Sequence, residues 1–141
     1  MRRWSGLFAI SLCICLGCSS NGPQTYPVTG HVKYKDGKPL VAATVEFQSA
    51  GGGVDGKSIS ARGVTQSDGA YEISTFAPGD GAIAGKHRVL VISPLPPGEI
   101  NPNKPPKPFI HPRFQRYDSS GLEYTVDPDG DNTFDITVDP P

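Results

Sequence analysis

The sequence predicts an all-β protein, an antiparallel sandwich of about seven short strands. Apolar side chains recur at every second position in several short segments, which is typical of strands with one buried face. Turns rich in glycine, proline and aspartate separate these segments at regular spacing. No segment has a convincing helical periodicity. These features together favour packed sheets over a helical domain.

The N-terminal segment is predicted to be an export signal and not part of the fold. Arg2 and Arg3 precede an uncharged, apolar or small stretch, 4–16, that is too short to span a bilayer as a stable helix. All three cysteines of the chain lie between positions 13 and 18. A zinc or redox site needs ligands on a folded polar scaffold, which this stretch does not offer. Plain secretion with incidental cysteines is the main alternative to the interpretation that follows.

Leu16-Gly17-Cys18 at the end of this signal resembles the lipobox of bacterial lipoproteins, although Cys15 stands where that family usually has Leu. In that family the cysteine thiol is acylated and the signal is cut directly before it. The resemblance implies a signal peptide at 1–17, lipidation of Cys18, and a lipid anchor and tether at 18–26. Palmitate-type acyl chains would then attach an exported protein to a bacterial membrane, in the periplasm or at the cell surface. No thiol would remain for a disulfide.

Composition narrows the classes of function. The 141 residues include 13 Lys and Arg and 14 Asp and Glu, and removal of the signal takes away Arg2 and Arg3. The exported part is therefore mildly acidic and has no basic tract, which argues against nucleic-acid binding. Its 17 Gly and 15 Pro are accompanied by aromatic and β-branched residues along the whole chain, so we expect one turn-rich β domain over 27–141.

The first two strands are predicted at 28–35 and 43–48. In the first, small or apolar residues alternate with polar ones, and one face holds Val28, Gly30, Val32 and Tyr34. The turn at 36–40 contains Asp36-Gly37, which suits a positive φ, and Pro39, which ends the ladder. In the second strand, Val45 and Phe47 are expected to face inward.

Three further strands are predicted between residues 58 and 93. The segment 58–65 is a weaker strand, and 70–75 places Tyr71 and Ile73 on one face. The segment 86–93 is the most continuously apolar, which indicates a central position in its sheet.

The stretch 94–112 is expected to be extended, exposed and partly polyproline II. It contains eight prolines, which rule out a regular ladder; they are Pro94, Pro96, Pro97, Pro102, Pro105, Pro106, Pro108 and Pro112.

Two strands, 121–126 and 133–138, are predicted to end the chain. The alternation places Leu122, Tyr124 and Val126 on one face of the former and Phe134, Ile136 and Val138 on one face of the latter. The turn residues at 127–132 predict that the two strands form an antiparallel hairpin.

In their order, these motifs resemble carboxypeptidase regulatory-like domains. VTGHVKYKDGKPLVAATVEF, TQSDGAYEI and GAIAGKHRVLV are similar to successive segments of that family, with Gln66 where Asp is usual and His87 at an aromatic position. IHPRFQRYDSSGLEYTV is similar to a segment of small bacterial lipoproteins built on the same domain. The resemblance covers Val28 to Val138 and implies a seven-stranded Greek-key, transthyretin-like (prealbumin-like) β-sandwich. It brings no catalytic residues, because these modules generally have none.

Few side chains suggest chemistry. Phe109, Phe114 and Tyr117 are possible ligand-binding aromatics beside the proline-rich stretch; the alternative is that Phe109 and Ile110 hold this stretch on the core. Asp127, Asp129 and Asp131 have the alternate spacing of calcium ligands, but Asn132 replaces the glycine that such loops require and Val138 replaces their glutamate. A turn explains the same aspartates. His31, His87 and His111 have no spacing that predicts a metal site.

We therefore expect a non-catalytic, lipid-anchored, exported β-sandwich without a cofactor. Its expected role is structural or protein-interacting at the cell envelope, with the membrane and an envelope protein or glycan as partners. The alternative is a carbohydrate- or peptide-binding module that uses the proline-rich loop 94–112. An enzyme is the third possibility; serines such as Ser119 and Ser120 have no local histidine partner.

Overall fold

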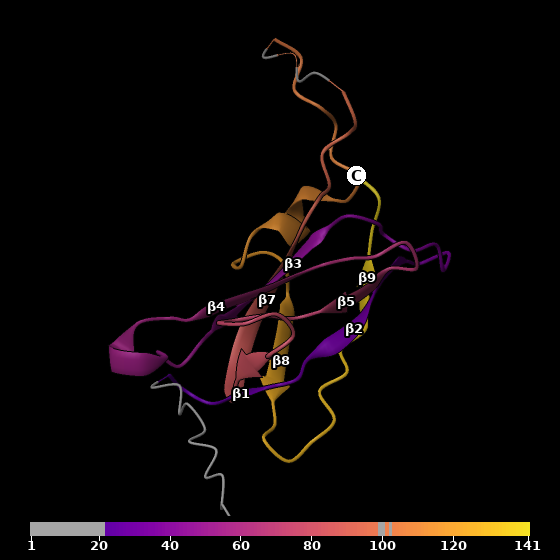
Figure 1. Ribbon diagram of the computed structural model, residues 1–141. Coiled ribbons are helices and arrows are strands. Elements are labelled where there is room, and N and C mark those ends of the chain that lie inside the picture. The colour runs from indigo at the N-terminus through magenta and orange to yellow at the C-terminus, as the bar shows by residue number, and fades with distance from the viewer. Residues whose placement is uncertain (1–21, 99–100, 102) are drawn as a thin grey trace, which may run out of the picture.

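A computed structural model of the chain describes residues 22–98, 101 and 103–141 (Figure 1). The predicted signal peptide and Cys18 lie outside these residues. The described part is all-β, as the sequence predicts, with nine strands and two short 3-10 helices, η1 (Val54–Gly56) and η2 (Pro112–Gln115). The strands are β1 (Thr25–Tyr26), β2 (Thr29–Tyr34), β3 (Thr44–Ser49), β4 (Ser60–Val64), β5 (Ala70–Glu72), β6 (Ala82–Ile83), β7 (Gly85–Ile92), β8 (Leu122–Val126) and β9 (Ile136–Val138).

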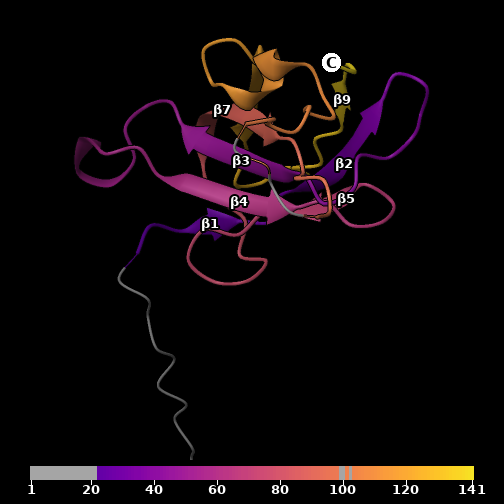
Figure 2. The ribbon, with the colours of Figure 1, turned by 90° about the horizontal axis from the view of Figure 1, so that it is seen from above.

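The strands form three sheets. The largest has the order β4-β3-β7-β8 and is antiparallel throughout. The second has the order β5-β2-β9, and the third is the short pair β1-β6. Arg62 on β4 and Ser74 after β5 exchange two backbone hydrogen bonds of 2.9 Å, which link the two larger sheets along one edge. Figure 2 shows β4, β3 and β7 side by side in one layer.

The predicted strands are present, and their apolar faces are buried. Val32 on β2, Val45 and Phe47 on β3, and Val89 and Val91 on β7 are each 0% exposed. The central position predicted for the 86–93 strand is confirmed, because β7 lies between β3 and β8. The Phe47 ring lies about 6 Å from three other rings between the sheets, those of His87, Tyr124 and Phe134.

The strand count and one connection differ from the prediction. The pair β1-β6 is additional, and it takes Thr25 and Tyr26 out of the tether predicted at 18–26. The predicted hairpin of the last two strands is wrong: β8 pairs with β7, whereas β9 pairs parallel with β2 in the other sheet. The residues 127–132 are therefore a crossover between sheets. Asn132 stabilises it, since its side chain accepts from the N–H of Asp127 and donates to the Asp127 carbonyl oxygen.

Gly30 explains how β2 and the end of the crossover approach each other. A Cβ at this position would overlap the Phe134 carbonyl, which lies directly over the strand. The Tyr71 hydroxyl donates a 2.6 Å hydrogen bond to the same carbonyl oxygen. Glycine is therefore required by close packing here, and not by a turn.

The β7–β8 connection leaves the sandwich and returns. The arm, which we define as residues 94–109, projects from one end of the molecule (Figure 1). Its described residues form no strand, as the prolines predict. The clamp segment, which we define as residues 110–121, then runs back along the sandwich and buries Ile110 and Phe114 in the core.

Candidate functional site

Three adjoining hollows surround the base of the arm. The middle one, the apolar groove, has a volume of about 320 Å³. It is lined by Tyr34, Pro39, Leu40, Val41, Ala42, Pro94, Leu95 and Phe109. Leu95 is 70% exposed, and Val41 and Phe109 are 44% and 43% exposed, so the groove presents apolar surface to solvent. Large apolar side chains gathered on a surface are typical of interaction sites.

Backbone and side-chain hydrogen bonds hold the walls of the groove in place. The Tyr34 hydroxyl donates to the Phe109 carbonyl oxygen at 2.9 Å, and the Phe109 N–H donates to the Ser93 hydroxyl at 2.8 Å. Burial, followed by the nearby Asp36 carboxylate, raises the pKa of Tyr34 above its ordinary value, so this donor keeps its proton. On the opposite wall, the Leu40 N–H donates to the Val32 carbonyl oxygen at 2.9 Å.

Ala42 gives this wall an unusual backbone. Its φ is 58°, in the left-handed region that non-glycine residues seldom adopt. Its N–H donates to the Thr65 carbonyl oxygen at 2.9 Å, which holds the conformation. Residues held in such conformations cost about 1–3 kcal/mol and cluster at functional sites.

The two flanking hollows add charge. One, of about 380 Å³, is lined by Tyr34, Lys35, Asp36, Lys38 and Pro140. The other, of about 260 Å³, lies between the two limbs of the arm and is lined by Ser93, Pro94, Leu95, Pro96, Pro106, Lys107, Pro108 and Gln115. The charged residues that line the three hollows are therefore three lysines and one aspartate.

The aromatics singled out from the sequence do not come together. Phe109 lines the groove, but Phe114 is 2% exposed and belongs to the core. The Arg113 guanidinium lies 4.3 Å from the centroid of the Phe114 ring and covers it. The alternative interpretation is that Phe109 and Ile110 hold the proline-rich stretch on the core. It holds for Ile110, which is fully buried, but not for Phe109, which remains open to solvent.

Tyr117 lies over the outer face of the four-stranded sheet, away from the groove lining. Its hydroxyl donates to Glu46 Oε1 at 2.6 Å, and Arg62 Nε donates to Glu46 Oε2 at 2.8 Å. Burial and the Glu46 carboxylate raise the pKa of Tyr117 well above its ordinary value. Glu46 on β3 and Leu90, the residue paired with it on β7, are only 8% and 7% exposed although they face away from the core. This cluster therefore attaches the clamp segment to the sheet.

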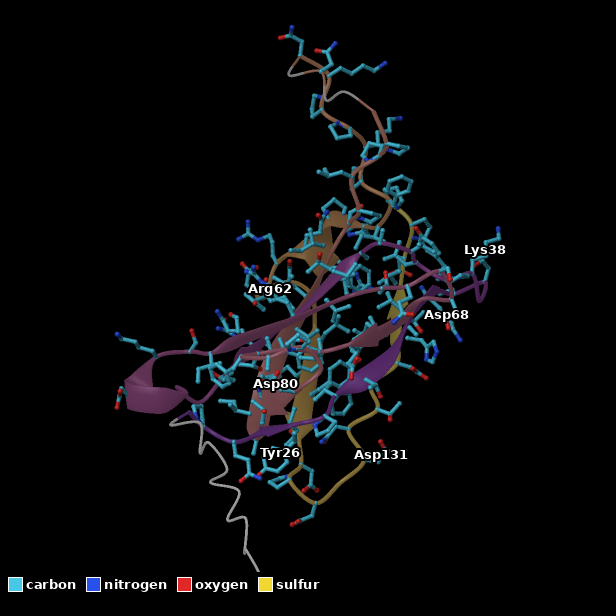
Figure 3. All side chains as sticks on the ribbon, viewed as in Figure 1. Tyr26, Lys38, Arg62, Asp68, Asp80 and Asp131 are labelled. Carbon is cyan, nitrogen blue, oxygen red and sulfur yellow. The ribbon has the colours of Figure 1, made fainter. Side chains whose placement is uncertain are left out.

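Two of the three candidate calcium ligands, Asp127 and Asp131, accept hydrogen bonds within the loop itself. Asp127 Oδ1 accepts from the Asp129 N–H at 2.9 Å, and Asp131 Oδ1 accepts from the Thr133 hydroxyl at 2.6 Å. Within the described residues, no group of three or more His, Cys, Asp or Glu side chains is arranged to hold a metal ion. The loop lies at the end of the molecule opposite the arm, where Figure 3 labels Asp131.

The histidines lie in three different environments. His31 Nδ1 is 3.3 Å from Asp135 Oδ1 at the surface, and His111 Nδ1 accepts from the Arg113 N–H at the start of η2. His87 is buried, and its Nδ1 donates to the Gly85 carbonyl oxygen at 2.9 Å. Burial lowers the pKa of His87 below its ordinary value, which favours the neutral form of the ring in the core.

Of the groove residues, the sequence singled out Phe109, and Pro94 and Leu95 lie in the proline-rich loop 94–112 of the alternative interpretation. The wall formed by residues 34–42 was missed. The walls of the groove come from two parts of the chain that are far apart in the sequence, residues 34–42 and residues 94–109. One signal was present in the sequence: Leu95 is a lone large apolar residue between prolines, in a stretch expected to be exposed.

The described part of the chain includes no helix that is long and apolar enough to cross a membrane. Comparisons with known proteins gave no match: no family model matches the chain, and no curated protein or solved structure is significantly similar to it.

Proposed function

We propose that this chain is a non-catalytic, lipid-anchored, exported β-sandwich with a protein-interaction role at the cell envelope. Its anchor is Cys18, whose thiol is acylated and before which the signal at 1–17 is cut, and its fold is the transthyretin-like sandwich of carboxypeptidase regulatory-like domains. The two larger sheets together hold seven strands, the number that this family implies. The short pair β1-β6 is an addition to that plan.

The observation that supports this proposal most directly is the position of the groove. The described chain begins at one end of the sandwich, and the groove lies at the other end, beside the arm. The first described residues, next to β1, lie at one end of the sandwich, and the arm projects from the other (Figure 1). A Cβ at Gly22 would be 3.9 Å from the Phe76 ring, which locates this entry point beside the loop after β5. A protein anchored just before residue 22 would hold its apolar groove away from the membrane.

The proposed tether is short, so it would keep the β1 end of the sandwich near the membrane. Thr25 and Tyr26 are paired with β6, so the tether would extend at most from Cys18 to Gln24. At roughly 3.5 Å for each extended residue, this segment spans about 25 Å at most. The acidic loop around Asp131 lies at the same end as Tyr26 (Figure 3). Repulsion from anionic lipid headgroups would hold that end off the surface.

The non-catalytic part of the proposal rests on how the polar groups of the sandwich are used. The Asp80 carboxylate accepts from the N–H groups of Thr75, Phe76 and Ala77. Burial alone would raise the pKa of Asp80, but these three donors lower it below its ordinary value. Like Tyr71 and Tyr117, Asp80 therefore serves the structure, and its lone pairs are engaged.

Replacement of the acceptor cysteine tests the anchor. We expect Cys18→Ser to abolish labelling by an alkyne analogue of palmitate and to move the protein from the membrane to the soluble fraction. Cys15→Ser is the matched control and should leave both unchanged. Labelling that persists in Cys18→Ser would contradict the proposed acceptor.

A photoreactive residue tests the interaction role in intact cells. Placed at Leu95, it should crosslink to an envelope protein; placed at Phe76, which is 59% exposed at the entry end, it should not give the same product. Equal products from both positions would contradict a role for the arm end.

A further inference from the structure

We propose that the apolar groove docks an extended, acidic segment of a partner protein, which inserts one large apolar side chain between Leu95, Phe109 and Val41. This inference rests on the proposed interaction role and names the chemistry of the partner.

The lining of the groove favours a protein side chain over a sugar. Among its residues, only Tyr34 has a polar side chain, and the Tyr34 hydroxyl already donates to the Phe109 carbonyl oxygen. Sugar hydroxyl groups that leave water need hydrogen-bond partners, which this lining does not offer. An aliphatic or aromatic side chain needs only apolar contact, and a volume of about 320 Å³ is ample for one.

The walls are stiff before any partner arrives. Pro39 and Pro94 line the groove, and Pro96, Pro106 and Pro108 line the hollow beside it. Proline rings fix φ, so these walls lose little conformational entropy on binding. Ala42 adds a strained backbone on the opposite wall, with its φ of 58°. Strain of this kind persists at ligand-binding positions.

The charges around the groove select an acidic partner. Lys35 and Lys38 line the hollow on one side, where they form exposed ion pairs with Asp139 and Asp36 at 2.6 and 3.2 Å, and Lys107 lines the hollow on the other side. Within the described part of the chain, no ion pair includes Lys107. Carboxylates of an extended segment that crosses the groove would meet lysines at both ends, which speeds association and fixes the register.

Two other occupants fit less well. The undescribed N-terminal residues precede β1, which lies at the end of the molecule opposite the arm (Figure 1). A second copy of the chain in a two-fold dimer would bring the same surface against itself. Such a dimer would place lysines opposite lysines, which is unfavourable.

Peptide selection tests this proposal while the partner is still unidentified. The bait is the exported full chain with Cys18→Ser, and the probe is a phage-displayed library of random dodecapeptides. We expect the enriched peptides to share a large apolar residue flanked by Asp or Glu. Fluorescein-labelled copies of these peptides should bind Leu95→Asp about tenfold more weakly or worse, as expected for a single apolar anchor.

Matched variants locate the binding. Phe76→Asp places the same new charge on an exposed apolar residue at the other end and should leave affinity unchanged. Lys107→Glu should weaken binding and reduce its salt dependence, whereas Lys57→Glu, on an exposed loop residue beside η1, should do neither. Circular dichroism of each variant verifies the fold.

Four results would overturn the proposal. They are no enriched sequence, an enriched sequence that is basic, binding that Phe76→Asp impairs as much as Leu95→Asp does, and a concentration-dependent dimer that Leu95→Asp dissolves. The last would assign the groove to a second copy. Because the bait has no anchor, a failure of the Cys18 proposal would appear in membrane fractionation and would leave the peptide result unaffected.

Discussion

The arm and the clamp segment are consecutive parts of one connection, yet they differ in how the sandwich uses them. The clamp segment places Ile110 and Phe114 in the core, and Tyr117 binds Glu46 on the outer face of the sheet. The arm is attached mainly at its base, through Ser93, Phe109 and Tyr34. β7 and β8 are antiparallel neighbours, which a tight turn could join. The fold therefore needs the clamp segment but not the arm. The arm is available for contacts with a partner.

The largest expected effect comes from the core side of this comparison. Phe114→Ala should lower the free energy of unfolding by about 3–5 kcal/mol, because it empties a fully packed aromatic site. Phe109→Ala, in the arm and 43% exposed, should lower it by only about 1 kcal/mol. Urea denaturation followed by fluorescence measures both. Equal losses would show that the arm is part of the core.

The crossover 127–132 offers a second comparison with the arm. Asn132→Ala removes both side-chain hydrogen bonds to the Asp127 backbone at a buried position, so we expect a loss of about 1–3 kcal/mol. Asp131→Ala, an exposed neighbour bonded only to the Thr133 hydroxyl, should change stability by about 0.5 kcal/mol or less. If Asn132→Ala has no effect in thermal melts, the crossover does not depend on this contact.

Alkaline pH should destabilise the fold through Tyr71 on β5. Burial raises the pKa of Tyr71 far above its ordinary value, and its hydroxyl donates to the Phe134 carbonyl oxygen. The folded state therefore retains this proton above about pH 10, where the unfolded chain releases it. The contribution of Tyr71 to the free energy of unfolding is fully present below that pH. Above it, this contribution should fall by about 1.4 kcal/mol per pH unit.

Tyr71→Phe separates this contribution from those of other tyrosines. Chemical denaturation between neutral pH and pH 11 should give a shallower decline for the variant, although its stability at neutral pH is lower. Parallel declines in the two proteins would show that Tyr71 ionises in the folded state.

The smallest effect is expected from the arm itself. Replacement of residues 96–106 by Gly-Ser-Gly-Ser should leave the free energy of unfolding within about 0.6 kcal/mol, since loop-closure entropy depends weakly on length. The same variant should lose binding of the selected peptides, because Pro106 and the fixed positions of Leu95 and Phe109 depend on the intact arm. A large loss of stability would contradict the view that the arm is surplus to the fold.

Particular residues show how far the sequence could predict this fold. The alternation through Val45 and Phe47 predicted β3 and its buried face, and the unbroken apolar run predicted that β7 is central. The same pattern also predicted β8 and β9, but not their partners. Asp-Pro-Asp-Gly is a strong turn signal, and it suggested a hairpin where the chain instead crosses between sheets.

Side-chain periodicity reports whether a strand has a buried face, which is a local property. Amino-acid order alone therefore determined the all-β class, most strand positions and the irregular backbone of the arm. Strand partners depend on which sheet edges remain free after the other strands have packed, and the groove depends on two distant parts of the chain, 34–42 and 94–109, that meet only then. The tertiary structure decided both, because contacts between distant segments leave no periodic trace in the chain.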